Sequence, residues 1–200
     1  MHVPEEPTKQ SKVKGLTPLS HRICKACVIL IAGCALFFLP VHCPSGMIGG
    51  SKSAHAENDT YNLKNAISAY FTEYRKYPDP REPEDRTFST NHGLMDILLG
   101  SEKEKGVGKG NPRMIGFFVG KQAKPMEGAR FRKGINLDEH GGGTFWDPYG
   151  VQYKVRVDSN RDNRVETPES PGTYLPESIL VWCAGPDGNF ETWDDNIKTW

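Results

Sequence analysis

A charge-free apolar run divides this chain and limits which part of it can fold as a globular domain. Residues 26–41 contain no charged side chain, and Arg22 and Lys25 precede them. A basic flank followed by an apolar segment is typical of an export or anchoring signal. Residues 1–22 are polar and rich in Pro, Lys and Ser, so we expect a disordered tail on the cytoplasmic side. One domain of roughly 140 residues remains beyond the run.

The apolar segment, taken as residues 23–42, is expected to be either a signal peptide or a membrane anchor. As a helix, its charge-free part would reach about 24 Å, less than the ~30 Å hydrocarbon core, so a membrane span would recruit flanking residues. Ala54-His55-Ala56 before Glu57 is an A-x-A pattern of the kind that signal peptidase cleaves. Residues 43–56 then form a linker or cleavage region, and residues 57–200 form the globular domain. Lipidation at Cys34, which ends Ile31-Ala-Gly-Cys34, is a third alternative.

The charge of the globular part bears on its partners, and its cysteine content bears on zinc binding. Residues 57–200 carry nineteen Lys and Arg against twenty-three Asp and Glu, whereas a nucleic-acid-binding domain usually presents a basic stripe. We therefore expect no nucleic-acid partner. Cys183 is the one cysteine of the globular part and is interpreted as a small buried apolar residue. The pair Cys24 and Cys27 lacks the second half of a zinc motif.

An amphipathic pattern predicts a long helix at the start of the globular part. Asp59 or Thr60 is the expected N-cap, and the helix should end before Pro78. The apolar residues that recur at three- and four-residue steps are Leu63, Ala66, Ile67, Tyr70, Phe71 and Tyr74. We expect this face to pack on a sheet. The prolines and glycines of residues 40–50 are expected to break any helix upstream.

Shorter elements follow from local patterns. Ser89 or Thr90 should cap a second helix that runs through Leu99, after a loop at residues 79–92. The remaining predicted elements are extended segments at 113–119 and 129–137, a turn at 144–150, an alternating strand at 151–157 and a more continuous apolar strand at 177–183. Together they predict an α+β domain with a small antiparallel sheet.

The C-terminal residues form an acidic loop. Asp187 lies in a Gly-Pro-Asp-Gly turn, and Asp194 and Asp195 follow shortly after. If the three carboxylates converge, a cation must offset their repulsion, and oxygen ligands favour Ca²⁺. The backbone carbonyls of Ala184 and Thr192 would complete the shell. The alternative is a simple turn with an aspartate N-cap.

A second acidic stretch lies between the two predicted strands. Asp158, Asn160, Asp162 and Glu169 match positions one, three, five and twelve of an EF-hand calcium loop. Strands rather than helices flank it, and arginines within it compete for the carboxylates. A polar connection between strands is favoured, and the metal site is kept as a secondary hypothesis.

Catalytic motifs are not found in the globular part. His92 and His140 are its histidines, and no Gly-x-Ser-x-Gly, His-Glu-x-x-His or phosphate-loop pattern accompanies them. We therefore expect a protein that is not an enzyme.

Three segments resemble the major pseudopilins of type II secretion systems. They are the helix end 65–78, the Asp147-Pro-Tyr-Gly150 turn, and the C-terminal Gly185-Pro-Asp-Gly188, Asp194-Asp-Asn-Ile197 and Trp200. The resemblance implies a long N-terminal helix packed on a small antiparallel sheet and a C-terminal calcium loop. It also implies Asp187, Asp194 and Asp195 as side-chain ligands, with the carbonyls of Ala184 and Thr192.

The same resemblance implies a non-enzymatic subunit in the bacterial cell envelope. Its expected partners are other pseudopilin-type subunits or secretion-machine components. It would be anchored in the inner membrane through residues 23–42 if they are uncleaved, and periplasmic or secreted after cleavage. The chain lacks the family's leader and the Phe-Thr-Leu-Ile-Glu start, and Asn196 is inserted before Ile197. The alternative is therefore an exported, calcium-stabilised binding domain that does not form a fibre, and a secreted enzyme is the third class.

Overall fold

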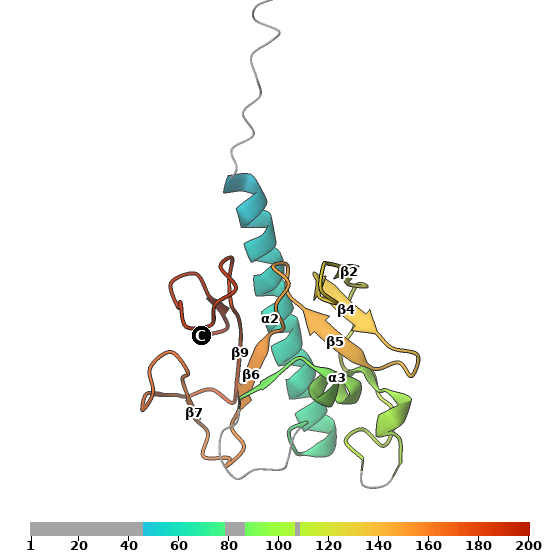
Figure 1. Ribbon diagram of the computed structural model, residues 1–200. Coiled ribbons are helices and arrows are strands. Elements are labelled where there is room, and N and C mark those ends of the chain that lie inside the picture. The colour runs from blue at the N-terminus through green and yellow to red at the C-terminus, as the bar shows by residue number, and fades with distance from the viewer. Residues whose placement is uncertain (1–45, 79–86, 107–108) are drawn as a thin grey trace, which may run out of the picture. The chain divides into compact units, whose positions relative to one another are not determined.

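The computed structural model describes residues 46–78, 87–106 and 109–200, and the chain from Ser45 onward forms one compact unit. The predicted tail at 1–22 and the apolar segment at 23–42 lie outside the described residues. None of the helices in the described ranges is long and apolar enough to cross a membrane. Helices and antiparallel strands mix along the chain (Figure 1), which confirms the α+β class. The elements are α2 (Gly46–Tyr74), β1 (Thr87–Ser89), α3 (His92–Leu99), the 3-10 turn η1 (Glu102–Glu104), β2 (Lys124–Pro125), β3 (Phe131–Arg132), β4 (Gly134–Leu137), β5 (Gly143–Trp146), β6 (Lys154–Val157), β7 (Val165–Glu166), β8 (Tyr174–Leu175), β9 (Ile179–Cys183) and β10 (Ile197–Lys198).

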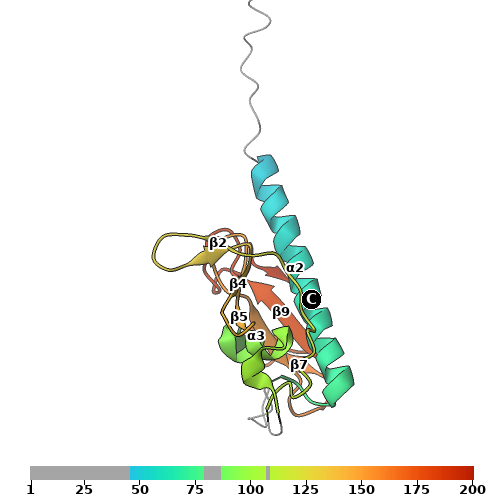
Figure 2. The same ribbon diagram turned by 90° about the vertical axis from the view of Figure 1, so that its right-hand side faces the viewer.

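Helix α2 packs one face on the sheet. Its fully or almost fully buried residues recur at three- and four-residue steps and are Ala56, Thr60, Leu63, Ala66, Ile67 and Tyr70. This spacing is the helical period of a single face. Most of the contacts of α2 are with β9 and β10, and Figures 1 and 2 show its N-terminal turns projecting beyond the strands. The buried face therefore fixes the helix along the central strand.

The N-terminus of α2 differs from the prediction. The helix begins at Gly46 rather than at an Asp59 or Thr60 cap, and it includes Gly49 and Gly50. A glycine inside a helix costs only about 1 kcal/mol relative to alanine, so a following stretch of good packing can outweigh it. Thr60 is instead buried inside the helix, where its hydroxyl donates to the carbonyl of Glu57 at 2.7 Å.

The largest sheet has the strand order β1-β6-β9-β10, and its adjacent strands are antiparallel. The strands predicted at 151–157 and 177–183 are present as β6 and β9 and pair with each other, with Val155 opposite Val181 and Val157 opposite Ile179. The observed strands are shorter than predicted. Strand β6 begins only at Lys154, because residues 151–153 follow the Asp147 turn and Gln152 forms only an isolated bridge to Trp146.

Strand β9 is buried on both faces, which explains its continuous apolar sequence. Ile179, Val181 and Cys183 contribute to the core under α2. Leu180 and Trp182 face the opposite side, where they form a second cluster with Val165. The partly buried residues packed against this second cluster are Leu175, Phe190, Trp193 and Trp200.

Helix α3 begins later than predicted. Asn91, not Ser89 or Thr90, is its N-cap, and the Asn91 side chain accepts the N–H of Gly93 at 3.0 Å. The residues before it include the short strand β1, which pairs with β6, where a loop was expected. Thr90 has another role, because its hydroxyl donates to the carbonyl of Phe145 at 2.7 Å and so ties β5 to the main sheet.

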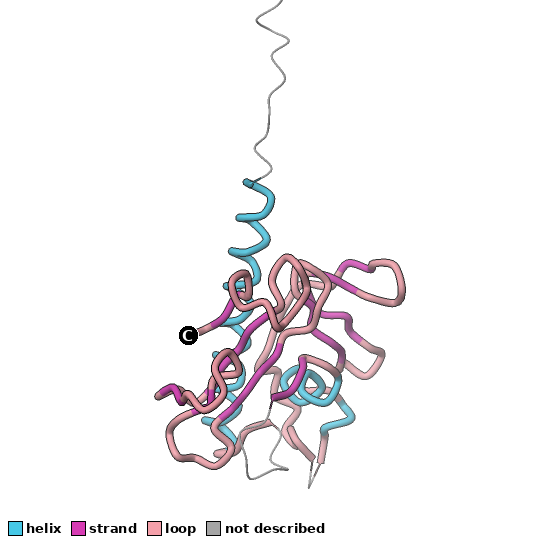
Figure 3. Tube along the Cα trace, turned by 60° about the vertical axis from the view of Figure 1, so that its left-hand side comes forward, coloured by secondary structure: helices cyan, strands magenta, loops and turns pink. Residues whose placement is uncertain are grey.

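The extended segment predicted at 113–119 does not form a strand. The backbone N–H groups of Phe117 and Phe118 both donate to the carbonyl of Leu98, at 2.8 and 3.0 Å. This contact satisfies the backbone at the end of α3 instead of a sheet ladder. The segment at 129–137 is split into β3 and β4 by Lys133, whose φ is 54°. Figure 3 shows these small sheets beside the main one.

Candidate functional site

The acidic C-terminal loop connects β9 to β10, two paired strands. Ile197 lies opposite Cys183 and Lys198 opposite Trp182, so both ends of the loop are fixed to the sheet. Gly185 starts the loop with φ 64°, and a Cβ there would meet the carbonyl oxygen of Asp195 at 2.3 Å. The glycine is therefore required for the close approach of the two ends of the loop.

Within this loop, the structure brings Asp187 and Asp195 together. The N–H of Asp187 donates to Asp195 Oδ2 at 3.3 Å, and the Thr192 hydroxyl donates to Asp187 Oδ2 at 2.6 Å. The Thr192 hydroxyl, together with the N–H of Asn189, holds the pKa of Asp187 below its usual value. Asp187 and Asp194 are exposed, and Asp195 is half-buried.

Two oxygen atoms of the loop are buried without a partner. Asp195 Oδ1 and Asn196 Oδ1 are both inaccessible and accept no hydrogen bond in the described part of the chain. The Asn196 amide is held in place because its Nδ2 donates to the carbonyl of Phe190 at 3.0 Å. Buried acceptors without donors cost free energy and suggest a missing partner, such as a water molecule or an ion.

The positions predicted as backbone ligands differ in their surroundings. Ala184 is fully buried directly after β9, whereas Thr192 is exposed at the tip of the loop. Among the described residues, Asp187, Asp194 and Asp195 do not form a group of three with ligand atoms within 4.8 Å of one another. The expected convergence of the three carboxylates is therefore not seen in this structure, and the backbone N–H of Asp187 is what contacts the Asp195 carboxylate.

The second predicted site, at residues 158–169, is organised by hydrogen bonds within the chain. Asp158 is buried, and its two carboxylate oxygens accept the N–H groups of Asp162 and Asn163 at 3.1 and 3.0 Å. Asn160 Oδ1 accepts the same Asp162 N–H at 3.0 Å. These three residues lie together as a turn, and the left-handed φ of 66° at Asn163 suits asparagine.

The other carboxylates of this stretch have basic partners. The Asp162 carboxylate pairs with Arg164 at 2.9 Å, which lowers the pKa of Asp162. Glu169 pairs with Lys198 of β10 and accepts the indole N–H of Trp200 at 3.4 Å. The Lys198 ammonium likewise lowers the pKa of Glu169. Glu169 therefore contacts the C-terminal residues Lys198 and Trp200, and the secondary metal site stays a prediction.

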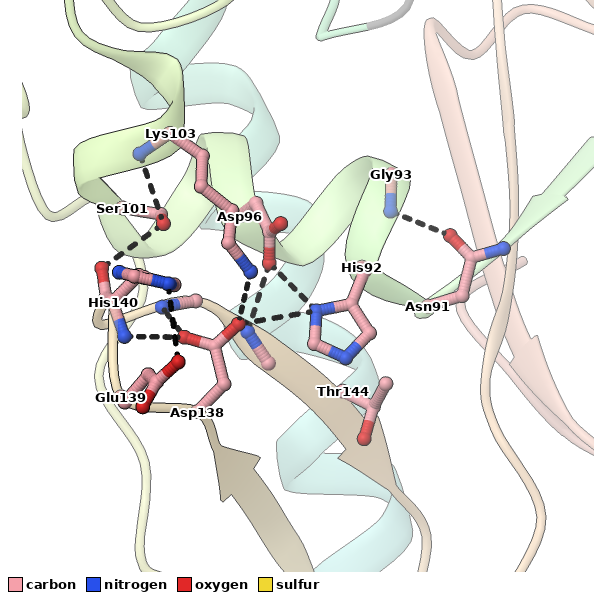
Figure 4. A network of polar contacts seen from close by, with 12 residues as sticks. Asn91, His92, Gly93, Asp96, Ser101, Lys103, Asp138, Glu139, His140 and Thr144 are labelled. Carbon is pink, nitrogen blue, oxygen red and sulfur yellow. Dashed lines mark hydrogen bonds and ion pairs between the residues drawn. The ribbon is translucent and has the colours of Figure 1, made fainter.

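A third polar group, which the sequence analysis did not predict, joins α3 to the β4–β5 connection (Figure 4). His92, Asp96 and Asp138 offer three ligand atoms that all lie within 4.8 Å of one another. His92 Nδ1 is 3.0 Å from Asp96 Oδ1 and 3.7 Å from Asp138 Oδ2. The spacing of His92 and Asp96, four residues apart on one helix, was a visible signal. Asp138 was not predictable from it, because it comes from a distant loop.

Both carboxylates of this group already have hydrogen-bond partners, and one of them pairs with an ammonium. The Lys103 ammonium lies 2.6 Å from Asp138 Oδ2 and lowers the pKa of Asp138 to about 2. Asp138 Oδ1 accepts the N–H groups of His140 and Gly142, both at 2.9 Å, and Asp96 Oδ1 accepts that of Gly143 at 2.9 Å. We interpret the network as a clamp that fixes the glycine-rich loop to α3 (Figure 4).

Asp147 is a buried acidic residue whose hydrogen bonds organise a turn and whose pKa is shifted. It is fully buried, and its Oδ1 accepts the N–H groups of Tyr149, Gly150 and Val151 at 2.8, 2.7 and 2.9 Å. Its Oδ2 is buried without a partner. Burial raises the pKa of Asp147 to about 6 despite these three hydrogen bonds. The residue therefore builds a turn over 147–151. The prediction of a turn at 144–150 was wrong for its first residues, which belong to β5 (Gly143–Trp146) and pair with β4.

Cys183, the cysteine in the described ranges, is free and buried. Burial raises the pKa of its thiol to about 12, so the sulfur is protonated and a poor nucleophile or ligand. Comparison of the chain with protein families, with curated proteins and with solved structures finds no match.

Proposed function

We propose that this chain is a non-enzymatic, pseudopilin-like structural subunit of a bacterial cell-envelope assembly such as a type II secretion system, with Ca²⁺ held in its C-terminal loop. The observation that carries the proposal is the pair of buried, unpartnered oxygens, Asp195 Oδ1 and Asn196 Oδ1. They lie in a segment, 185–196, that has four acidic residues and no basic one. Contact with the membrane would be made by residues 23–42 where they are retained.

The donor set suits calcium. The carboxylates of Asp187, Asp194 and Asp195 with the carbonyls of Ala184 and Thr192 give five oxygens, and Asn196 Oδ1 is a sixth candidate. Calcium takes about six to eight oxygen ligands, whereas zinc and copper prefer the thiolate and imidazole ligands that are absent from this loop. When bound, Ca²⁺ supplies two positive charges that offset the repulsion among the three carboxylates. The inserted Asn196 would then contribute to the site.

The surrounding fold supports a structural role. The loop joins β9 and β10, and β9 packs under α2. Trp200 beyond β10 packs edge-on against Trp182 at a centroid distance of 5.7 Å. An ion that orders the loop would therefore hold the last residues of the chain on the sheet, and with them the surface that meets another subunit.

Calcium is expected to raise the melting temperature of the full chain, measured in a non-ionic detergent with excess Ca²⁺ and then with a chelator. A ligand present at about 100 times its Kd stabilises the folded state by about 2.7 kcal/mol, which is a shift of about 5–10 °C for a chain of this size. Asp187→Ala is expected to abolish the difference between the two conditions, because it removes a proposed ligand.

Glu191→Ala is the matched control for this experiment. Glu191 is an exposed acid of the same loop that is not among the proposed ligands, so its variant should keep the calcium-dependent shift. Equal melting temperatures of the wild-type chain in calcium and in chelator would refute the metal site. A shift that survives in Asp187→Ala would place the ion elsewhere.

A further inference from the structure

A cavity of about 280 Å³ lies beside α2, between the helix and the residues that lead into β4. Its basic residues are His55, Lys121 and Lys133. The amides of Asn58 and Asn62 lie on the helix wall, and the rings of Phe118 and Phe145 also line the cavity. Cations and amide N–H groups over an aromatic lining are suited to a carboxylate carried on a short side chain.

The two lysines are placed by a close contact of the backbone. A Cβ on Gly134, whose φ is 142°, would meet the carbonyl oxygen of Lys121 at 2.3 Å. Lys133, directly before it, has a left-handed φ of 54°, which is uncommon for a lysine. The glycine thus lets the chain segments that carry Lys121 and Lys133 approach closely.

One acidic residue also lines the cavity, and its charge is already partly offset. The Asp59 carboxylate accepts the Tyr153 hydroxyl at 3.1 Å. Burial raises the pKa of Asp59, while the Tyr153 hydrogen bond and the charges of His55 and Lys133 lower it. Lys121 and Lys133 form no ion pair within the described residues. With two lysines against one aspartate, the cavity keeps positive charge.

The rim of the cavity carries an exposed apolar side chain. Val119 lines the cavity and is 88% exposed. It is the most exposed of the large apolar residues in the described part of the chain. The surrounding segment, residues 121–133, adds Lys124, Arg130 and Arg132 against a single acid, Glu127. A basic cavity with an apolar rim favours contact with an acidic, partly apolar surface.

The chain itself carries such a surface, the loop 185–195. It contains Asp187, Glu191, Asp194 and Asp195 without a basic residue, and it includes Phe190 and Trp193. These four acids form no ion pair in the described part of the chain. Figure 1 shows the C-terminal loop to the left of α2 and β2 and β4 to its right. Within one chain, Phe190 of the loop lies near Arg130, since both line a pocket with Gly150 and Val151, but the acids of the loop are not paired with the lysines of the cavity.

We propose that the cavity lined by Lys121 and Lys133 receives the Glu191 carboxylate of the loop 185–195, the acid of that loop that is not a proposed calcium ligand, from a second copy of this chain. The two surfaces are different, so the contact is head-to-tail. Repeated, it gives a ring where the rotation closes and, where it does not, an open filament with one free loop and one free cavity at its ends. This inference deepens the proposed function, because the role of the contact in assembly rests on it. The contact would join subunits through their globular parts, outside the apolar segment at residues 23–42.

Self-association of the full chain in non-ionic detergent tests the contact, measured by sedimentation velocity over a range of concentrations at low and high salt. We expect association that weakens as salt screens the charges. Lys121→Glu with Lys133→Glu is expected to raise the dissociation constant about tenfold, as for the loss of two exposed charge pairs. Glu191→Lys, which leaves every proposed calcium ligand in place, should also weaken association.

Mixing the two variants is the decisive measurement. A Lys121→Glu, Lys133→Glu chain and a Glu191→Lys chain should associate with each other more tightly than either does with itself. Lys105→Glu with Lys109→Glu makes the same change of net charge at exposed lysines elsewhere and should leave association unchanged.

Several outcomes would overturn the proposal. They are a wild-type chain that stays monomeric at low salt, a control pair that weakens association as much as the cavity pair, and mixed variants that fail to associate.

Each measurement is made in calcium and in chelator. A charge-dependent association that persists while the melting temperature ignores calcium would reject the metal site and keep this contact.

Discussion

Asp147→Ala is expected to lower the free energy of unfolding by about 3 kcal/mol at pH 7, because it removes the acceptor of three hydrogen bonds at once. Asp147 Oδ1 accepts three successive N–H groups of the turn, and the residue is fully buried. Water has little access to replace the lost acceptor, at least for the buried bond from Gly150. Urea unfolding of the full chain, followed by tryptophan fluorescence, measures the change.

Asp147→Asn is the matched control, since its side-chain carbonyl can keep the same three hydrogen bonds. It removes a charge that burial disfavours by on the order of 2–3 kcal/mol at pH 7. The amide group that replaces the unpartnered Oδ2 costs about 1 kcal/mol, so we expect no loss of stability, or a small gain, at pH 7. Equal losses for the alanine and asparagine variants would show that the charge, and not the hydrogen bonds, stabilises the turn.

The asparagine variant also isolates a pH effect. The pKa of Asp147 is raised from 3.8 to about 6 by burial, so between these values the unfolded chain has released the proton that the folded chain still holds. The contribution of Asp147 to stability is therefore full below about pH 4 and falls as the pH rises to about 6. A shift of this size corresponds to on the order of 2–3 kcal/mol.

Unfolding at pH 4, 5, 6 and 7 reports this contribution as the difference between wild type and Asp147→Asn. The wild type should lose stability relative to the variant as the pH rises through this window. A constant difference across the window would mean that Asp147 titrates at its ordinary pKa in the folded chain.

The parts of the fold that the sequence predicted are those with a local period. The three- and four-residue steps at Leu63, Ile67 and Tyr70 placed these residues on one face, and all three are fully buried. The uninterrupted apolar residues of β9 predicted a strand, and the two clusters show that this strand is buried on both faces. In both cases neighbouring residues alone carry the signal.

Other features depend on contacts between distant segments. Phe117 and Phe118 have a strand-like sequence, but their N–H groups bond to Leu98 at the end of α3, which no local pattern encodes. The start of α2 was misplaced because glycine is only a weak helix breaker. A glycine in the sequence is more informative where the backbone has a positive φ, because that conformation disfavours any residue with a side chain.

The candidate sites show the same limit. Spacing predicted that Asp187 and Asp195 share a loop, and a hydrogen bond joins them. It could not predict that Glu169 of the second loop would pair with Lys198, because β8 and β9 intervene and the partner belongs to β10. The His92, Asp96 and Asp138 group was missed for the same reason, since two of its members share a helix and the third arrives through the β4–β5 connection.

Gly185→Ala is expected to destabilise the C-terminal loop more than any other alanine substitution of a glycine within it. At Gly185 a Cβ would meet three atoms of Asp195, the carbonyl oxygen at 2.3 Å, its carbon at 2.8 Å and Cγ at 3.0 Å. Two of these atoms are backbone and cannot rotate away. The φ of 64° adds strain of about 1–2 kcal/mol for a residue with a side chain.

Gly188→Ala separates these two effects. Gly188 has a similar φ of 72°, but its Cβ would meet only the Val151 side chain, at 3.6 Å. We therefore expect a loss of about 1 kcal/mol for Gly188→Ala from strain alone, and at least about 3 kcal/mol for Gly185→Ala, because Asp195 must move. Urea unfolding of both variants of the full chain gives the comparison.

Calcium dependence of the two variants links the backbone to the proposed ion. Displacing Asp195 removes a proposed ligand, so Gly185→Ala should show the same melting temperature in calcium and in chelator. Gly188→Ala should keep the shift, since Asp195 stays in place. If both variants lose the shift equally, strain anywhere in the loop abolishes binding and the contact between Gly185 and Asp195 has no special role. If both keep it, Asp195 is not a ligand, and the unpartnered Asp195 Oδ1 needs another explanation.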